Sequence, residues 1–205
     1  MSPLRVIRSY FRKGTILAFF ISLLVIFFSS ITFADTWEVE TVDSGGNVGK
    51  YTSLAVGKGR SLGKGIPFDQ IFISYYDSTN LDLKHAMWVL TSWNICTVDA
   101  AGDVGMWSST TTSSRDTSGD IVHISYFDNT NYDLKVATFE GWYNIRISTV
   151  DAAGDVGRYS SIALDSSKNE HIVYSSPSTL KHSWRVGSSF NIETIVSEAA
   201  SYESI

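Results

Sequence analysis

Hydrophobic and polar residues alternate in short runs from about residue 35 onward, as in β-strands. In the segment 121–126, Val122, Ile124 and Tyr126 fall on one face of a strand, and polar side chains fall on the other. The clearest stretch predicts strands at 159–165, 171–175, 180–186 and 190–196. The stretch before it predicts the same order, from Trp107 onward and at 122–127, 133–139 and 142–150. Turn-forming residues separate the runs, and no helical stripe interrupts them.

Two sequence landmarks recur together along the chain. The first, Val-Asp-x-x-Gly-x-Val-Gly, begins at Val42, Val98 and Val150, with spacings of 56 and 52 residues. The second, Ile-Ser-Tyr followed by an aromatic residue and Asp-x-x-Asn-x-Asp-Leu-Lys, begins at Ile73 and Ile124. A degenerate third copy of it lies at 171–174. Two landmarks in a fixed order indicate a tandem repeat of about fifty residues.

Each repeat is predicted to be a four-stranded antiparallel blade of an all-β fold, a β-propeller. A β-sandwich or a β-solenoid is the runner-up. The predicted repeat domain spans residues 35–205, with units at about 43–98, 99–150 and 151–196 and the start of a further unit at 197–205. Residues 37–42 match the last strand of a unit, so the array is expected to open on a fourth strand. About three blades make a partial ring with an uncovered sheet face, and self-association is therefore expected.

The first 34 residues have a different composition. Basic residues come first, an apolar run follows, and the small residues Thr32 and Ala34 precede Asp35. This order is typical of a secretory signal peptide, and cleavage is expected after Ala34. The alternative is an uncleaved membrane anchor at residues 15–34, because the apolar stretch is just long enough to span a bilayer. The protein is therefore expected to be secreted or held at the cell surface.

Charge and cysteine content narrow the functional classes. Residues 1–34 hold four of the 16 lysines and arginines and none of the 21 acidic residues, so the remaining chain has a formal charge of −9. An acidic protein is a poor partner for nucleic acid, and none is expected. Cys96 is the only cysteine, so no disulfide can form within the chain. We expect Cys96 to pack as a small hydrophobic residue.

The two landmarks resemble repeats of large secreted prokaryotic proteins of the sialidase-like, Asp-box (BNR-type) propeller kind. The resemblance covers most of residues 37–196 and implies blade architecture. It does not extend to the sialidase active site, which needs an arginine cluster and a nucleophile pair. No arginine of this chain lies in the Arg-Ile-Pro motif of that family. The nearest match, Gly65-Ile66-Pro67, has glycine in place of the arginine. Loose similarity to the Asp box is confined to residues 164–169.

The candidate binding residues come from the second landmark and its copy. Aromatic rings beside carboxylates and amides suit sugar binding, since the ring stacks on the sugar and the polar groups bond its hydroxyls. The candidates are Tyr76, Asp77, Asn80, Asp82, Phe127, Asp128, Asn131 and Asp133. The alternative is that Asp77 and Asp128 only cap their own turns. Oxygen-rich loops of this kind can also hold Ca²⁺, which is the one cofactor considered.

Other recurrent residues are expected to serve the scaffold. Asp43, Asp99 and Asp151 occur once per unit before a pair of glycines, which predicts turn or cap aspartates. We therefore expect a non-catalytic extracellular module that recognises a glycan or a protein through its loops, with no catalytic residue assigned. The alternatives are a fragment of a sialidase-like glycoside hydrolase and a structural piece of a larger surface protein.

Overall fold

The computed structural model describes residues 38–58, 69–89, 91–114, 119–140 and 144–197. The chain divides into two compact units, residues 1–40 and 41–205, and all the described strands lie in the second. The predicted signal peptide lies outside the described residues, as does the predicted further unit apart from Ser197. Among the residues described, no helix has the length and apolar character needed to cross a membrane.

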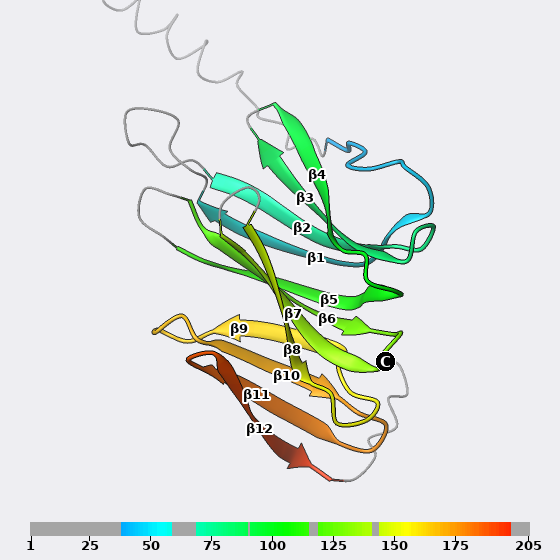
Figure 1. The fold of residues 1–205 in the computed structure, drawn as a ribbon. Helices are drawn as coiled ribbons and strands as arrows, with labels where there is room; N and C mark the ends of the chain where they lie inside the picture. Colours follow the sequence, from blue (N-terminus) through cyan, green and yellow to red (C-terminus); the bar gives the residue numbers. More distant parts are fainter. Residues whose placement is uncertain (1–37, 59–68, 90, 115–118, 141–143, 198–205) are drawn as a thin grey trace, which may run out of the picture. The chain divides into compact units, whose positions relative to one another are not determined.

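Residues 41–205 form three four-stranded antiparallel sheets in which each strand pairs with the next along the chain (Figure 1). The first sheet contains β1 (Val48–Lys58), β2 (Asp69–Asp77), β3 (Asp82–Val89) and β4 (Ser92–Asp99). The second contains β5 (Val104–Ser113), β6 (Ile121–Asp128), β7 (Asp133–Glu140) and β8 (Asn144–Asp151). The third contains β9 (Arg158–Leu164), β10 (Glu170–Ser175), β11 (Leu180–Val186) and β12 (Ser189–Val196). The predicted all-β architecture is confirmed, and the third sheet matches its predicted strands to within one residue.

The predicted opening strand at residues 37–42 is wrong for its described part. Residues 38–42 form no strand, and the first strand begins only at Val48. A fourth strand of a blade needs a third strand beside it, and the described residues place none upstream. The first sheet therefore takes all four strands from residues 48–99.

Two apolar clusters hold the sheets together, one at each sheet-to-sheet interface. The cluster between the first and second sheets contains Phe72, Leu83, Val98, Val104, Val122, Ile124, Tyr126, Ala137 and Phe139. The cluster between the second and third contains Leu134, Val136, Val150, Val156, Ile162, Ile172 and Tyr174. One face of a sheet cannot bury its apolar side chains alone, so each sheet depends on its neighbour.

Hydroxyl groups join the first strand of a sheet to the first two strands of the preceding sheet. Ser108 donates to the carbonyl of Tyr51 at 2.8 Å and contacts the Ser74 hydroxyl at 2.9 Å. The backbone N–H of Thr110 donates to Ser53 Oγ at 2.9 Å. The next interface repeats this pattern, with Ser160 donating to Trp107, Ser125 contacting Ser160, and Ile162 donating to Ser109. We call this set of contacts the hydroxyl seam.

Two glycines permit the close approach of neighbouring sheets. Gly105 and Gly157 have φ of 106° and 103°, which side-chain-bearing residues rarely adopt. A Cβ at Gly105 would lie 2.7 Å from the Cα of Leu83, and one at Gly157 would lie 2.7 Å from the Cα of Leu134. The glycine in the repeated Val-Gly pair is thus required at both interfaces between sheets.

Candidate functional site

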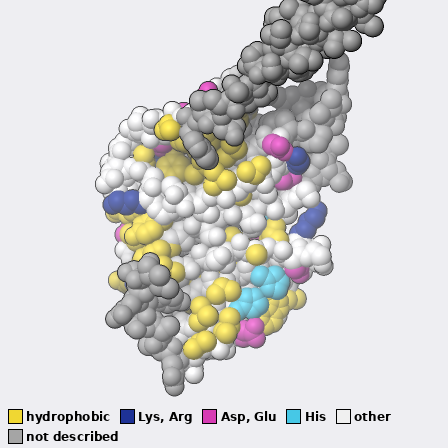
Figure 2. Space-filling model, turned by 180° about the vertical axis from the view of Figure 1, so that it is seen from behind, with side chains coloured by type: hydrophobic (Ala, Val, Ile, Leu, Met, Phe, Trp, Pro, Cys, Tyr) yellow, Lys and Arg dark blue, Asp and Glu magenta, His cyan; other side chains and the backbone are white. Residues whose placement is uncertain are grey.

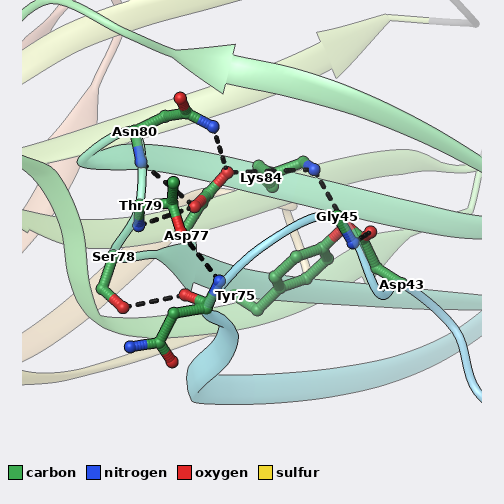
Figure 3. Close-up of polar contacts among 9 residues, drawn as sticks. Asp43, Gly45, Tyr75, Asp77, Ser78, Thr79, Asn80 and Lys84 are labelled. Atoms are coloured by element: carbon green, nitrogen blue, oxygen red, sulfur yellow. Dashed lines mark hydrogen bonds and ion pairs between the residues drawn. The ribbon is translucent and has the colours of Figure 1, made fainter.

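Asp43, which precedes β1, binds Tyr75 and Lys84 of the first sheet (Figure 3). Its Oδ2 accepts hydrogen bonds from Lys84 Nζ at 2.7 Å and from the Tyr75 hydroxyl at 2.6 Å. Its Oδ1 accepts the backbone N–H of Gly45 at 2.9 Å. The bonds from Lys84, Tyr75 and Gly45 lower the pKa of Asp43 from 3.8 to about 2. We call such an aspartate, tyrosine and lysine a latch.

The same latch joins neighbouring sheets. In the second latch Asp99, at the end of β4, accepts a 2.7 Å hydrogen bond from Tyr126 and lies 3.7 Å from Lys135. In the third, Asp151 at the end of β8 accepts bonds from Tyr174 at 2.8 Å and Lys181 at 2.9 Å. Each carboxylate also caps its own turn by accepting the N–H of Ala101 or Ala153. The predicted turn role of these aspartates is confirmed, and their link to the next sheet is an addition to it.

We expect the first latch to make folding stability depend on acidity. The pKa of Asp43 is lower in the folded protein than in the unfolded chain, so the latch contributes fully above about pH 4. Its contribution is lost as the pH falls from about 4 to about 2. Urea unfolding of the wild type and of Asp43→Asn at pH 6 and at pH 3 tests this. The stability difference between the two proteins should shrink at pH 3, and an unchanged difference would contradict the assignment.

The candidate residues Asp77 and Asn80 build the turn between β2 and β3 (Figure 3). Asp77 Oδ1 accepts the N–H groups of Thr79 at 2.9 Å and Asn80 at 3.2 Å, and Oδ2 accepts the Asn80 amide at 2.8 Å. Burial alone would raise the pKa of Asp77, but these hydrogen bonds and the charge of Lys84 outweigh it and lower the pKa. Asp128 and Asn131 make the same three bonds in the turn of the second sheet.

These bonds leave the turn carboxylates little capacity for a cation. Both oxygens of Asp77 already accept hydrogen bonds from its own turn, and Ca²⁺ requires six to eight oxygen ligands. Within the described ranges, no three side chains of histidine, cysteine, aspartate or glutamate are grouped to hold a metal ion. A role for these residues toward a ligand or Ca²⁺ stays a prediction.

The other four candidates lie around the same turns. Asp82 and Asp133 sit opposite the turn aspartates, and burial together with the charge of Asp77 or Asp128 raises their pKa values. The Tyr76 hydroxyl donates to Asp103 at 2.8 Å, and Asp103 also accepts the amide of Asn129 at 2.7 Å. Asp103 thereby joins the two turns.

Phe127 and Tyr76 support a row of aromatic rings that the sequence reasoning did not single out. The row consists of Tyr51 in β1, Trp107 in β5 and Tyr159 in β9. The Trp107 ring centre lies 5.2 Å from that of Tyr51 and 5.0 Å from that of Tyr159. Tyr76 lies 6.0 Å from Tyr51, and Phe127 lies 5.4 Å from Trp107. We call the three first-strand residues the aromatic row.

The backbone holds each member of the row in an unfavourable conformation. Tyr51, Trp107 and Tyr159 have φ of 53°, 50° and 52°, a region that bulky residues rarely adopt. The register of the first strand shifts around Tyr51 and Trp107, as at a β-bulge. Strain of this kind persists only where the surroundings enforce it, and it is concentrated at functional sites. Tyr51 and Tyr159 remain 39% and 58% exposed.

Charged groups border the row at its third member. The Arg158 guanidinium lies 4.9 Å from the ring centre of Phe127 and 5.7 Å from that of Trp107. It also donates to Asp155 Oδ2 at 2.8 Å. The other oxygen of Asp155, Oδ1, is buried with no hydrogen-bond partner among the described residues.

The fold defines a partial β-propeller of three blades. Similar solved structures include AofleA from Arthrobotrys oligospora, with a TM-score of 0.55 at 13% identity, covering 82% of this chain and 49% of that chain. A mutant of AofleA lacking three arginines gives a TM-score of 0.55 at 14% identity. A mutant of Aleuria aurantia lectin in complex with α-methyl-L-fucoside gives 0.52 at 12% identity, covering 83% of this chain and 52% of that chain. The chain thus spans about half the length of these proteins.

Comparison by sequence gives no relative. No protein-family profile matches the chain, and no curated protein matches it. The sialidase-like, Asp-box resemblance therefore has no support from sequence comparison, and the likeness in fold is to a lectin. At these identities the likeness establishes the blade architecture, and any activity has to be argued from this chain's own residues.

The sequence did contain a signal for the aromatic row. The second position after Val-Gly is aromatic in every unit, in Tyr51, Trp107 and Tyr159. Recurrence once per unit favoured a scaffold role, as for the recurrent aspartates. The positive φ at these positions, which keeps the rings at the surface, has no signature in the residue pattern.

Proposed function

We propose that this protein is a non-catalytic glycan-binding module that acts outside the cell and binds sugar on the aromatic row. The observation that carries the proposal is the repeated strain, since three bulky aromatic residues share the same left-handed backbone conformation. Packing alone gives no reason to keep a tyrosine or tryptophan at such a position three times. Presenting adjacent flat rings to a ligand does give such a reason.

The groups around the row have the chemistry that sugars require. Aromatic rings stack on the apolar face of a sugar, while carboxylates and guanidinium groups bond its hydroxyls. Arg158 supplies donors beside Trp107, and the Asp155 carboxylate, whose side chain is 33% exposed, supplies an acceptor. Tyr76 and Phe127, two of the candidates from sequence, support the rings from behind. The lectin among the solved neighbours, in complex with a fucoside, makes α-methyl-L-fucoside the first sugar to test.

Removing the central ring should abolish most of the affinity. We expect Trp107→Ala to weaken binding at least about tenfold, which corresponds to about 1.4 kcal/mol, because Trp107 contacts both other members of the row. Calorimetric titration of the full chain with α-methyl-L-fucoside, followed by a wider glycan panel, measures this. Thermal unfolding should show that the variant still folds.

Trp93→Ala provides the matched control. Trp93 is the second residue of β4, at the opposite end of the first sheet from the turn between β2 and β3, and its ring packs on Trp88. Sugar affinity should be unchanged in this variant. Equal losses in both variants, or no retention of any glycan by the wild type, would contradict the proposed site. Hydrolysis of chromogenic glycosides would contradict the non-catalytic assignment.

A further inference from the structure

The first and third sheets each have a face that no other described sheet covers, and both faces expose apolar side chains. On the first sheet, Leu54 and Val56 are 60% and 59% exposed beside a cleft of about 390 Å³. On the third sheet, Val173 is 38% exposed, and the rings of His171 and His182 stack at 5.2 Å. Figure 2 shows histidine side chains beside hydrophobic ones at the surface. We call these the leading face of the first sheet and the trailing face of the third.

Contacts between such faces already exist inside the chain. The trailing face of the first sheet packs on the leading face of the second, where Thr110 Oγ1 donates to Ser74 Oγ at 2.6 Å. The trailing face of the second packs in the same way on the leading face of the third. The two interfaces share the hydroxyl seam and the close approach at Gly105 and Gly157. One mode of packing therefore serves both junctions.

The uncovered faces carry residues at the same positions that meet at the junctions inside the chain. Leu54 takes the position of Thr110, since each lies opposite an isoleucine of the next strand. Val173 takes the position of Ser74, since each lies opposite a serine of the first strand. At both junctions inside the chain a serine occupies the trailing position, with Thr110 at the leading position of the first junction and Ile162 at that of the second, whereas both terminal positions are apolar. The two uncovered faces thus match each other in polarity at this pair of positions.

From this match we infer that a second copy of the chain docks head to tail, with the trailing face of each copy on the leading face of the other. Two identical junctions of this kind close a two-fold symmetric pair. The chain covers 49–52% of the solved propellers that it resembles, so two copies supply about the number of residues of one such protein. The inference does not depend on sugar binding.

Ring contacts support the same arrangement. Inside the chain, His85 on the trailing face of the first sheet packs on Phe139 of the second sheet, with ring centres 4.9 Å apart. By register, His182 takes the position of His85 on the third sheet, and Trp88 takes that of Phe139 on the first. Head-to-tail docking places Trp88 of one copy against His182 of the other. Both faces thereby bury an aromatic ring that is otherwise at the surface.

Cysteine pairing distinguishes this arrangement from other modes of association. Oxygen atoms at the positions of Thr110 and Ser74 are 2.6 Å apart, so cysteines at Leu54 and Val173 of different copies would be within reach of a disulfide. Leu54→Cys and Val173→Cys are prepared separately in the full chain with Cys96→Ala, purified in mild detergent, mixed and oxidised. We expect a covalent dimer in the mixture and none in either variant alone.

The alternative outcomes each overturn the inference. A covalent dimer in Leu54→Cys alone would show that like faces pair. No covalent dimer in the mixture, together with a monomeric mass by light scattering, would show that other parts of the chain or another partner cover the faces. Larger linear assemblies would show that the pair does not close.

A glycine substitution tests the contact without adding a reactive group. Gly49 has a φ of 90° and nothing within 4 Å of its Cβ position, whereas the corresponding Gly105 lies against Leu83. In the docked pair Gly49 would lie against Leu180 of the second copy, so Gly49→Ala should raise the dimer dissociation constant at least about tenfold. Gly154→Ala is the control, because Gly154 has a similar φ of 94°, also with nothing within 4 Å, and lies on no uncovered face. Equal dissociation constants for both variants would overturn the inference.

Discussion

Replacing Gly157 with alanine should destabilise residues 41–205 by about 2–5 kcal/mol, a large part of the stability of a small domain. Two effects add. The φ of 103° is unfavourable for any residue with a Cβ, and the new methyl group would lie 2.7 Å from the Cα of Leu134. That atom belongs to the backbone of β7, so it can move only if the second and third blades separate. Urea unfolding followed by tryptophan fluorescence measures the loss.

Gly154→Ala separates the two effects. Gly154 precedes Gly157 in the same loop and has a φ of 94°, but a Cβ there meets nothing within 4 Å. Its replacement should therefore cost only the conformational part, about 1–2 kcal/mol. If both variants lose the same stability, the close packing of blades at Gly157 is not what requires a glycine.

Asp151→Ala should cost about 3–5 kcal/mol, because it removes the acceptor at the centre of a buried latch. The Asp151 side chain is only 3% exposed, and it accepts hydrogen bonds from Lys181, Tyr174 and the N–H of Ala153. Without it, the Lys181 ammonium and the Tyr174 hydroxyl remain between blades with no counter-charge. Chemical unfolding of the variant at neutral pH gives the size of the effect.

Two further variants establish that the loss of stability comes from the partners left without an acceptor. Asp165→Ala removes a turn aspartate whose side chain is 35% exposed and bonds Asn169, and it should cost much less than Asp151→Ala. Adding Lys181→Met to Asp151→Ala should recover part of the lost stability, since it removes the unpaired charge. No recovery would mean that the stability comes from the turn cap and not from the link between blades.

The strands could be predicted because each blade repeats a local pattern. The four strands of the third blade follow from alternation and turn residues alone, and the structure has them at 158–164, 170–175, 180–186 and 189–196. The turn role of Asp151 was also predictable, because the bond to Ala153 joins residues two apart. Local hydrogen bonds of this kind are encoded in short segments.

Contacts between blades could not be read from the same pattern. Tyr174 lies 23 residues from Asp151 in sequence, and only the packing of one blade on the next brings the two together. The aromatic row depends further on three backbone conformations with positive φ at non-glycine residues. A residue pattern gives no sign of such strain, since it is imposed by neighbouring strands. The opening strand at 37–42 was predicted wrongly because similarity to a fourth strand does not supply the third strand that it needs.

The hydroxyl seam has a consequence for how this chain can change over generations. Ser108 and Ser160 each bond a backbone carbonyl of the preceding blade, which any residue can supply, and the hydroxyl of Ser74 or Ser125. A duplicated unit that keeps a serine at the position of Ser74 and Ser125 would therefore meet a compatible neighbour, whereas Val173 of the third blade offers no hydroxyl there. Duplication or deletion within the first two blades preserves these contacts, so the number of blades can change there in steps of one.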